Sequence, residues 1–351
     1  MDPNVRENDV VLITGGTGSF GKTMARHLLS KQCGEVRVFS RDEEKQETMR
    51  LDSSDPRLRF VIGDVRDSAA VDAVMEGVDL VFHAAALKQV PSCEFFPMEA
   101  VRTNILGSSN VIESAVRHGA RSVVCLGTDK AVYPVNTMGM TKAIMEKVVQ
   151  SVARRLRTND TVVSSVRYGN VMYSRGSVIP LFVKQILAGK PVTITHPDMT
   201  RFLLPLPAAI DLVEFAFSHA EQGDVFIKKA PACTVADLAR ALAELFNVEH
   251  RVERVGIRHG EKMHETLASA EELRRSEDMG DYFRVRLDAR DLNYNLYFTE
   301  GDTADDVSSD YTSASTQQLS VAEVKQLLLS LPEMQAVLSN RGQRGTSEPR
   351  T

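Results

Sequence analysis

The stretch that decides the fold is Val10-Val11-Leu12-Ile13-Thr14-Gly15-Gly16-Thr17-Gly18-Ser19-Phe20-Gly21. Four apolar, mostly β-branched residues run directly into a glycine-rich turn, which is typical of a buried parallel strand. Beyond the turn, apolar residues recur at helical spacing, at Phe20, Met24, Ala25 and Leu28. A strand, a glycine turn and a helix in this order predict the first βαβ unit of a dinucleotide-binding domain.

The glycines of this turn fit a nucleotide site for physical reasons. Gly15 and Gly18 lack side chains where the backbone must turn and approach a pyrophosphate, and Gly21 lets the helix lie close to the strand. The helix N-terminus directs free N–H groups at the phosphates. Tight turns also use glycine for ordinary reasons, so the position between a strand and a helix is what favours the nucleotide site.

Composition excludes several classes of protein. The chain has 351 residues, of which 43% are apolar and 25% charged, as in soluble globular proteins of one large or two smaller domains. A net charge of −5 gives no basic field for nucleic acid or an anionic membrane. No apolar run approaches the ~18 residues of a membrane span. The N-terminus has no signal-peptide core, so we expect a cytoplasmic protein without membrane insertion.

The four cysteines are scattered and form no CxxC pair; they are Cys33, Cys93, Cys125 and Cys233. This spacing indicates reduced packing residues rather than disulfides or zinc ligands. His259 and His264 also lack a metal-binding pattern, so no metal site is expected.

Strands and helices alternate over about the first 170 residues. Further strands are predicted at 36–39, 60–62, 78–83, 122–126 and 161–168, with a helix at about 137–157 before the last. This order predicts an α/β fold, a Rossmann-like doubly wound parallel sheet with a smaller, interleaved C-terminal substrate domain.

The second half is irregular because prolines interrupt it. A short strand at 225–227 and helices at 235–246 and 319–331 stand out by their periodicity. The expected domains are an NADP-binding domain at 1–170 with a returning strand near 223–229, a sugar-nucleotide domain at 171–310, a C-terminal helix at 311–335 and a disordered tail at 336–351.

The end of the second strand bears on cofactor choice. An acidic residue there favours a ribose 2′-hydroxyl, whereas arginine accommodates a 2′-phosphate. Ser40 and Arg41, with Lys45 one turn later, favour NADP over NAD. Asp42 complicates this interpretation, and Arg41 and Lys45 are alternatively solvated surface charges. After the fourth strand, Ala84-Ala85-Ala86 leaves room for a flat adenine and its ribose.

Further motifs extend the pattern of the glycine turn, and with it the chain resembles the extended short-chain dehydrogenase/reductases. Within them it resembles the capsule- and flagellin-type UDP-N-acetylglucosamine 4,6-dehydratases, over roughly residues 9–330. The motifs that carry this resemblance are Phe39-Ser40-Arg41-Asp42-Glu43, Gly63-Asp64-Val65-Arg66-Asp67, Ala84-Ala85-Ala86-Leu87-Lys88, Thr128-Asp129-Lys130-Ala131, Arg167-Tyr168-Gly169-Asn170-Val171, Ser174-Arg175-Gly176-Ser177-Val178 and Gly260-Glu261-Lys262.

The resemblance implies a hydro-lyase that serves bacterial surface polysaccharide or glycan biosynthesis. The cofactor takes hydride from C4 of the sugar, a base removes the acidified C5 proton, and the C6 hydroxyl leaves as water. Hydride then returns to C6. By resemblance, Lys130 is the C5 base, Asp129 protonates the departing oxygen, and Thr128 binds the O4 side. Without the motif, Asp129 would be a turn cap and Lys130 a surface charge.

One position departs from the wider family pattern of Tyr-x-x-x-Lys. Lys142 occupies the lysine position and is expected to bind the nicotinamide ribose, but Met138 stands where the tyrosine is expected. A thioether has no proton to exchange, and losing a positioned acid/base typically costs ~10²–10⁴ in rate. The capsule-type branch resembles this chain in having methionine here, so another group should do the work. Candidates are Thr128 relaying to Lys142, Lys130, or one of Tyr133, Tyr168 and Tyr173.

The fold and the resemblance together imply two further sets of contacts. Cofactor contacts are expected at Thr14, Gly15, Thr17, Gly18, Ser19, Phe20, Gly21, Ser40, Arg41, Lys45, Asp64, Val65, Ala84, Ala85, Ala86, Lys88, Asn104 and Lys142. Sugar-nucleotide contacts are expected at Lys88, Asn170, Arg175, Ser177, Val178, Arg201, Arg258 and Glu261, although each charged residue alone could form a surface salt bridge.

Three hypotheses follow. The first is a UDP-N-acetylglucosamine 4,6-dehydratase, expected to be homo-oligomeric and, by resemblance, to invert C5. The second is another nucleotide-sugar enzyme of this fold, such as a 4-epimerase, which has no use for a C5 base. The third is a non-catalytic NADP-binding protein, favoured only by Met138.

Overall fold

The computed structural model describes residues 5–31, 33–157, 160–174, 176–288 and 309–345. The chain divides into two compact units, each assembled from three separate segments. Unit 1 contains Met1–Tyr168, Leu206–Lys229 and Thr266–Tyr311, and unit 2 contains Gly169–Pro205, Ala230–Glu265 and Thr312–Thr351. The chain first passes from unit 1 into unit 2 after Tyr168, close to the expected boundary at residue 170. The region 171–310, however, is not one domain, because two of its segments complete unit 1.

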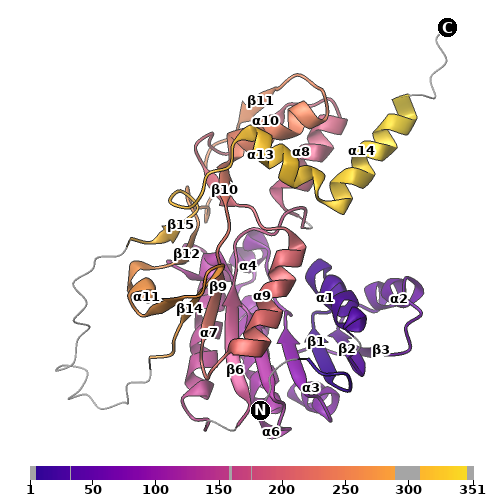
Figure 1. Cartoon of the computed structure of the whole chain (residues 1–351), viewed down its shortest axis with the longest axis vertical. Helices are drawn as coiled ribbons and strands as arrows, with labels where there is room; N and C mark the ends of the chain where they lie inside the picture. The colour runs from indigo at the N-terminus through magenta and orange to yellow at the C-terminus, as the bar shows by residue number, and fades with distance from the viewer. Residues whose placement is uncertain (1–4, 32, 158–159, 175, 289–308, 346–351) are drawn as a thin grey trace. The chain divides into compact units, whose positions relative to one another are not determined.

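Unit 1 is organised around a central sheet that has nine strands among the described residues, in the order β13-β14-β9-β6-β5-β4-β1-β2-β3 (Figure 1). The seven strands from β9 to β3 in this order run parallel. β14 and β13 extend the β9 edge in antiparallel fashion. The predicted Rossmann-like parallel sheet is therefore confirmed, with an antiparallel extension that the sequence pattern did not predict. The strands are β1 (Val10–Thr14), β2 (Glu35–Ser40), β3 (Leu58–Ile62), β4 (Leu80–His83), β5 (Ser122–Leu126), β6 (Val162–Arg167), β9 (Val225–Lys228), β13 (Ser276–Asp278) and β14 (Tyr282–Val285).

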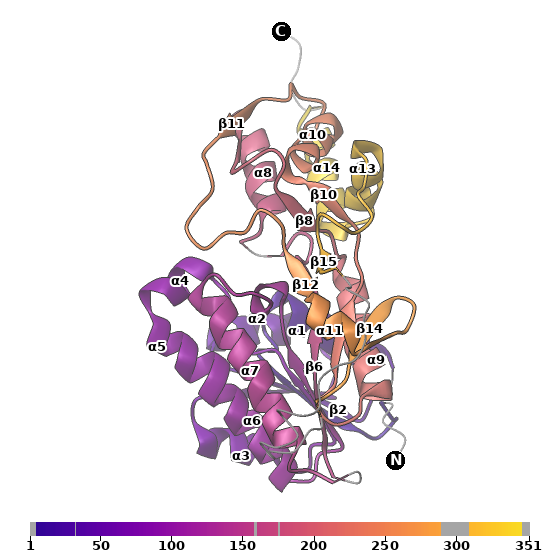
Figure 2. The same ribbon diagram turned by 90° about the vertical axis from the view of Figure 1, so that its left-hand side faces the viewer.

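Helices cover both faces of this sheet, which explains why its central strands β1, β4 and β5 are mostly apolar on both faces. The helices are α1 (Ser19–Ser30), α2 (Glu43–Leu51), α3 (Ser68–Met75), α4 (Val90–Phe95), α5 (Pro97–Ala100), α6 (Gly107–Arg117), α7 (Thr137–Ala153), α9 (Leu206–His219) and α11 (Ala270–Arg274), with a π-helix η1 (Val101–Leu106) and a 3₁₀ turn η2 (Asp129–Ala131). Successive strand residues point to opposite faces. Val11 and Ile13 pack with α1 and α9, whereas Leu12 packs with α3 and α6. α3, α6 and α7 lie side by side on this second face (Figure 2).

Unit 2 has a separate apolar core. Its helices are α8 (Val178–Leu187), α10 (Val235–Leu245), α13 (Val321–Leu329) and α14 (Pro332–Gly345). Two small sheets complete it, an antiparallel pair of β8 (Thr200–Phe202) with β10 (Ala232–Thr234) and a parallel pair of β7 (Val192–Ile194) with β11 (Val252–Arg254). A further short pair joins β12 (Thr266–Ala268) to β15 (Tyr311–Thr312).

The predicted helix at 319–331 is confirmed as α13, which begins with a capping box between Ser320 and Glu323. Its Val324 and Leu328 are buried against α10. The expected tail at 336–351 is partly wrong, because residues 336–345 continue α14. Val337 and Leu338 in this stretch are partly buried against the core of unit 2, next to the fully buried Met334, which gives the continued helix apolar surface to bury.

Over the described residues, no helix is both long enough and apolar enough to cross a bilayer. All four cysteines are buried free thiols.

Candidate functional site

The expected cofactor and catalytic residues of unit 1 follow adjacent strands of the sheet. In the order β6-β5-β4-β1, each parallel strand ends in one of the predicted motifs. These are Tyr168 after β6, Thr128 after β5, Ala84 after β4 and Gly15 after β1. Because the carboxyl ends of parallel strands form one edge of the sheet, these motifs share the edge at which such folds bind their ligands.

The glycine turn has the close approaches that its residues predict. Gly15 has a positive φ of 68°, and a Cβ there would lie 2.8 Å from the Cα of Ala85. A Cβ on Gly21 would lie 2.4 Å from the Cα of Gly16, so only glycine allows α1 to begin this close to the turn. The first turn of α1 contains no acidic side chain. The loop therefore leaves backbone space and free N–H groups that fit a dinucleotide phosphate.

Of the side chains after β2, Asp42 pairs with the neighbouring Lys45, whereas Ser40 and Arg41 carry hydrogen-bond donors. Asp42 accepts the Lys45 N–H as N-cap of α2, and its carboxylate also pairs with the Lys45 ammonium. The acidic residue that complicated the cofactor interpretation is thus neutralised locally. Arg41 is half-exposed and lies 3.4 Å from the Asp64 carboxylate. Ser40 is buried, and its hydroxyl oxygen accepts from Thr17 and Gln46.

Both hydrogen bonds into Ser40 come from other side chains, so its own proton remains to be donated. Together with the Arg41 guanidinium, this hydroxyl is a donor set that suits a 2′-phosphate.

Thr128, Asp129 and Lys130 form a compact polar turn after β5. Asp129 is 1% exposed, and its Oδ1 accepts from the Thr128 hydroxyl at 2.8 Å and from Lys130 Nζ at 3.1 Å. The backbone N–H of Asp129 donates to the Tyr168 carbonyl. A Cβ on Gly139 would lie 2.2 Å from the Lys130 carbonyl oxygen, so α7 can pack against this turn only because residue 139 is glycine. The Lys130 amine and the buried Asp129 carboxyl group are thus held within hydrogen-bond distance of each other.

Helix α7 places Met138 and Lys142 one turn apart, and both are 5% exposed. Met138 packs in a small apolar cluster with Cys93 and Ala100. Burial lowers the pKa of the Lys142 ammonium to about 8, while the Cys125 thiol and the Glu146 carboxylate oppose that shift. Met138 is therefore a packing residue, whereas Lys142 has ionisable groups as neighbours.

Asn104 was expected to contact the cofactor, but its amide is used inside the protein. It lies in η1, accepts from the Leu87 N–H at 2.8 Å, and donates to the Leu87 carbonyl and the Thr141 hydroxyl at 3.0 Å each. These bonds connect the segment after β4 with α7. The direct contact between Asn104 and the cofactor stays a prediction.

Sequence reasoning missed a buried chain of hydrogen bonds next to Asn104. Ser108 donates to the Asn104 carbonyl, so it accepts from His83 Nε2 at 2.8 Å. The other ring nitrogen of His83 then accepts from the Thr14 hydroxyl at 2.7 Å. Burial, with the Lys142 charge, lowers the pKa of His83 to about 3, which keeps the ring neutral. A histidine ending an apolar strand was the available signal for this link between the glycine turn and the Asn104 segment.

The remaining cofactor positions frame this edge. Val65 is buried, and its carbonyl accepts from the side-chain amide of Asn110. The Ala85 N–H donates to the Thr14 hydroxyl, Ala84 and Ala86 are partly buried beside it, and Lys88 is exposed. The Phe20 ring is stacked on Tyr168 with centroids 5.7 Å apart.

The three candidate tyrosines have different surroundings. Burial and the nearby Asp129 carboxylate raise the pKa of Tyr168 above its usual value. Tyr133 is 55% exposed and donates to Asp310 at 3.3 Å. Tyr173 belongs to unit 2. Among these, Tyr168 has the Asp129 carboxylate as an electrostatic neighbour.

The expected sugar-nucleotide residues belong to unit 2, apart from Lys88. Ser177 is the N-cap residue of α8 but makes no capping bond, and its hydroxyl is buried without a partner among the described residues. The same holds for Asn170 Oδ1. Val178 begins α8 and packs against the core. Ser177 at the N-terminus of α8 thus leaves a polar atom that fits an anionic or hydrogen-bonding ligand, and Asn170 leaves a second such atom elsewhere in unit 2.

The charged residues expected to bind the sugar nucleotide differ in burial and in their partners. Arg201 is mostly buried, donates to the Thr200 carbonyl at 2.8 Å and lies 3.8 Å from Glu265. Arg258 is 58% exposed and lies 3.6 Å from Glu261, the surface pair that was the alternative interpretation. His264 contacts the Thr200 hydroxyl, in agreement with a hydrogen-bonding role. Arg175 lies outside the described residues.

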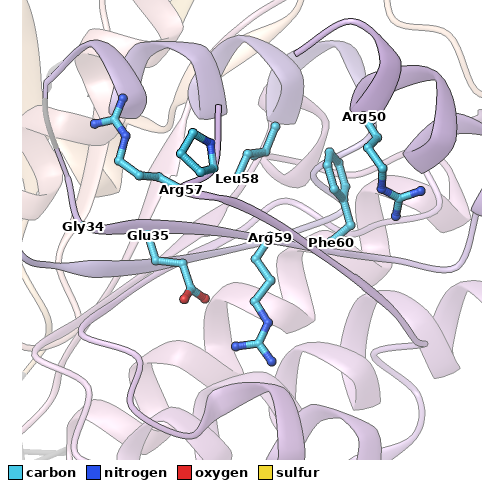
Figure 3. A pocket seen from close by; sticks show the side chains of 8 residues that line it. Gly34, Glu35, Arg50, Arg57, Leu58, Arg59 and Phe60 are labelled. Atoms are coloured by element: carbon cyan, nitrogen blue, oxygen red, sulfur yellow. The ribbon is translucent and has the colours of Figure 1, made fainter. Parts of the chain in front are cut away.

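A pocket of about 480 Å³ lies elsewhere in unit 1, at the start of β2 and β3 (Figure 3). Arg50, Arg57 and Arg59 line it, but Arg57 is paired with Asp55 and Arg50 stacks over Phe60. None of the predicted site residues lines this pocket. Among the described residues, no three His, Cys, Asp or Glu side chains are grouped to hold a metal ion.

Comparison with known families covers nearly the whole chain. Residues 11–287 match the family described as polysaccharide biosynthesis protein, and residues 288–335 match its C-terminal family. The chain belongs to the polysaccharide biosynthesis protein family. The wider resemblance to extended short-chain dehydrogenase/reductases agrees with this membership.

Curated relatives in this family carry the name UDP-glucose 4-epimerase. The protein of Rickettsia canadensis (strain McKiel) is 52% identical over 334 residues, which are 94% of this chain and 98% of the relative. The protein of Rickettsia akari (strain Hartford) is 51% identical with the same coverage.

Solved structures have the same fold. Pen from Bacillus thuringiensis matches with a TM-score of 0.83 and 34% identity, over 92% of this chain and 97% of Pen. DesIV, a dTDP-glucose 4,6-dehydratase from Streptomyces venezuelae solved with NAD, matches with a TM-score of 0.66 over 72% of this chain and 86% of that chain. At 23% identity, DesIV supports the fold alone.

Proposed function

We propose that this member of the family is an NADP-dependent UDP-N-acetylglucosamine 4,6-dehydratase, a cytoplasmic hydro-lyase that inverts C5. The observation that carries the proposal is the contact of 3.1 Å between Lys130 Nζ and the buried Asp129 Oδ1. A dehydration across C5 and C6 needs a base and an acid side by side. A 4-epimerase needs neither at C5.

The two groups can exchange roles without taking a proton from solvent. As an ion pair, Asp129 is ionised and Lys130 protonated; transfer of one proton between them produces a carboxylic acid and a neutral amine. Burial of Asp129 favours this uncharged form. The amine then removes the C5 proton, and the acid protonates the departing C6 oxygen, which leaves as water. The pair returns to its ionised form, so the protons of the elimination balance. The proton that leaves O4 when C4 is oxidised is matched by the proton that C5 takes up when the hydride returns to C6.

The nicotinamide cofactor, when bound, supplies the acceptor for the C4 hydride and returns that hydride to C6. The residues that fit it are the glycine turn, the Ser40 and Arg41 donors, and Lys142, whose ammonium would hold the ribose. Thr128 would bind the O4 side of the sugar. Ser177, Val178, Asn170, Arg201, Arg258 and Glu261, with Arg175 and Lys88, would bind the sugar nucleotide.

A UDP-glucose 4-epimerase is the second candidate, and the Rickettsia relatives favour it by name at about half identity. Incubation of the purified protein with UDP-N-acetylglucosamine and, separately, with UDP-glucose distinguishes the two. A dehydratase yields a 4-keto-6-deoxy sugar with a C6 methyl signal in the proton NMR spectrum. An epimerase yields a C4 epimer that keeps its C6 hydroxyl. No product from either substrate would favour the non-catalytic NADP-binding protein.

The reaction should invert C5 and yield UDP-2-acetamido-2,6-dideoxy-β-L-arabino-4-hexulose. Inversion needs a proton donor on the face opposite Lys130, since the C5 proton returns from the other side of a flattened intermediate. Run in D₂O, the reaction should place deuterium at C5, and the product couplings should report the L-arabino configuration. A D-xylo product would contradict inversion and leave the dehydratase assignment in place.

The protein should purify with NADP bound, because a cofactor restored in every turnover need not leave. Ser40 and Arg41 supply donors for its 2′-phosphate, and Asp42 is neutralised by Lys45. Denaturing the protein and identifying the released nucleotide by mass spectrometry tests this expectation. Release of NAD alone would show that the donors after β2 were misinterpreted.

We also propose a homo-oligomer, supported by apolar side chains exposed around the contacting helices α4, α5 and α7: Phe95, Phe96, Met98, Met140 and Ile144. Such a patch is unusual on a monomer. Light scattering of the purified protein should report more than one chain, and the double variant M140E/I144E should reduce that mass. An unchanged mass would place the interface elsewhere.

A further inference from the structure

Arg167, the last residue of β6, has an unusually complete set of partners. Its side chain is 6% exposed. Nε donates to both carboxylate oxygens of Glu146, at 2.9 and 3.1 Å. Nη2 donates to Glu146 and Glu272 at 2.6 and 2.8 Å, and Nη1 donates to Glu272 and the Leu267 carbonyl at 2.9 and 3.2 Å. All five guanidinium N–H groups are therefore satisfied inside unit 1.

These bonds join three segments that are distant in the chain. Glu146 lies in α7, one turn beyond Lys142, and Glu272 lies in α11, where it also closes the capping box with Ser269. A bidentate guanidinium–carboxylate contact fixes direction as well as distance. The Arg167 guanidinium thus sets the position of α7 and of the returning segment Thr266–Arg274 relative to the end of β6.

The residues on either side of Arg167 hold the Asp129–Lys130 turn by backbone hydrogen bonds. The Gly127 N–H donates to the Val166 carbonyl at 2.7 Å, and the Asp129 N–H donates to the Tyr168 carbonyl at 3.3 Å. A Cβ on Gly127 would lie 2.6 Å from Glu146 Oε1, so the Glu146 carboxylate reaches this place only beside a glycine. The same strand end therefore supports the turn that carries Asp129 and the helix that carries Lys142.

The cluster also has an electrostatic effect. One guanidinium and two carboxylates leave a net negative charge one helical turn from the Lys142 ammonium. Three ionisable groups influence that ammonium: the Cys125 thiol and the Glu146 carboxylate favour its charged form, and the neutral His83 ring lies within electrostatic range. Burial raises the pKa of the Cys125 thiol to about 12, so this group carries no charge at neutral pH.

We propose that Arg167, Glu146 and Glu272 are the positioning residues of the reaction, which hold the Asp129–Lys130 turn and Lys142 in register. Arg167 sets the geometry, and Glu146 in addition keeps Lys142 protonated. The expected effect of Arg167 on kcat rests on the proposed function. The expected effect of Glu146 on nucleotide binding depends only on Lys142.

The test compares R167K and E146Q with R284K. Arg284 lies in β14 of the same sheet and is a matched control: it is 7% exposed and paired with Asp224 and Glu221, which precede β9 in the chain. R167K and R284K should lose similar amounts of thermal stability. R167K should also lower kcat by ~10- to 100-fold through misplacement of the reacting groups, with KM less affected. R284K should keep the kcat of the unmodified protein.

The pH profile separates a structural role from this one. Lys142 binds ribose as an ammonium, so affinity for NADPH, followed by its fluorescence, should fall as the pH rises through about 8. E146Q removes the charge that raises this pKa, so the fall should move to lower pH by roughly one unit. R167K keeps both carboxylates and should leave the midpoint in place.

Equal kcat in R167K and R284K would overturn the geometric role, and an unmoved midpoint in E146Q would overturn the electrostatic one. If the unmodified protein dehydrates no sugar nucleotide, the proposed function fails while the NADPH titrations still decide the role of Glu146. If R167K does not fold, E272Q takes its place, because it keeps the size of the side chain and removes the charge that the Arg167 guanidinium contacts through Nη1 and Nη2. E272Q should show a loss in kcat in the same direction as R167K, and an unchanged kcat would overturn the geometric role.

Discussion

Replacing Lys130 by methionine should lower the rate of dehydration by about 10²–10⁴-fold, the usual contribution of a positioned base. Methionine preserves the length of the side chain but cannot accept the C5 proton. Lys130 is the amine held 3.1 Å from Asp129, whose carboxyl group is assigned to the acid step. The rate is measured by the C6 methyl signal of the product, and KM should change little if sugar binding is left intact.

D129N provides the complementary measurement. Asparagine is isosteric with the buried Asp129 and cannot protonate the C6 oxygen, so water should fail to leave. In D129N, Lys130 must lose its proton to solvent instead of to Asp129, so exchange of the C5 proton with D₂O should persist only at high pH. In K130M the exchange should disappear at every pH, which separates the acid from the base. Normal formation of the C6 methyl product in K130M would contradict the role of Lys130 as the C5 base.

Replacing Lys142 by methionine should abolish measurable turnover and weaken NADPH binding. Lys142 is the buried ammonium of α7, and with Met138 in place of a tyrosine no second polar group precedes it by one turn. Lys147 is a matched control, since it lies on the same helix but is exposed. K147M should keep both activity and affinity, whereas an active K142M would show that the helix was misinterpreted.

Substitutions at Met138, on the same helix, should change stability more than activity. Its side chain packs against Cys93 and Ala100, so M138A should cost about 2–5 kcal/mol of unfolding free energy and lower activity modestly. M138L conserves the volume and should restore both. A complete loss of activity in M138L would give the thioether itself a chemical role.

The parallel part of the fold could be predicted because its signals are local. Each strand from β1 to β6 is a short apolar run bounded by turn residues, and each functional motif follows such a run directly. Rules for parallel sheets then bring Gly15, Ala84 and Thr128 to one edge without further information.

What could not be predicted depends on contacts between distant segments. β13 and β14 are short and half-polar, and they become strands only because β9 offers an open edge. Arg167 resembles any arginine at a strand end until Glu146 and Glu272 are placed around it. Likewise, the Asn104 amide had the right chemistry for a ligand, but its partners proved to be Leu87 and Thr141.

The interleaving of the two units has a consequence for biogenesis on the ribosome. β6 is complete at Arg167, but its neighbour β9 begins only at Val225, after a stretch that belongs first to unit 2. At a synthesis rate of ~5–20 residues per second, the residues between β6 and β9 take about 3–12 s to be made, and during this time the β6 edge is unpaired. An exposed apolar edge strand is a template for wrong pairing. A fragment that stops near residue 168 would keep that edge permanently, so the nucleotide-binding half should aggregate when expressed alone and should need the later segments, supplied on the same chain, to stay in solution.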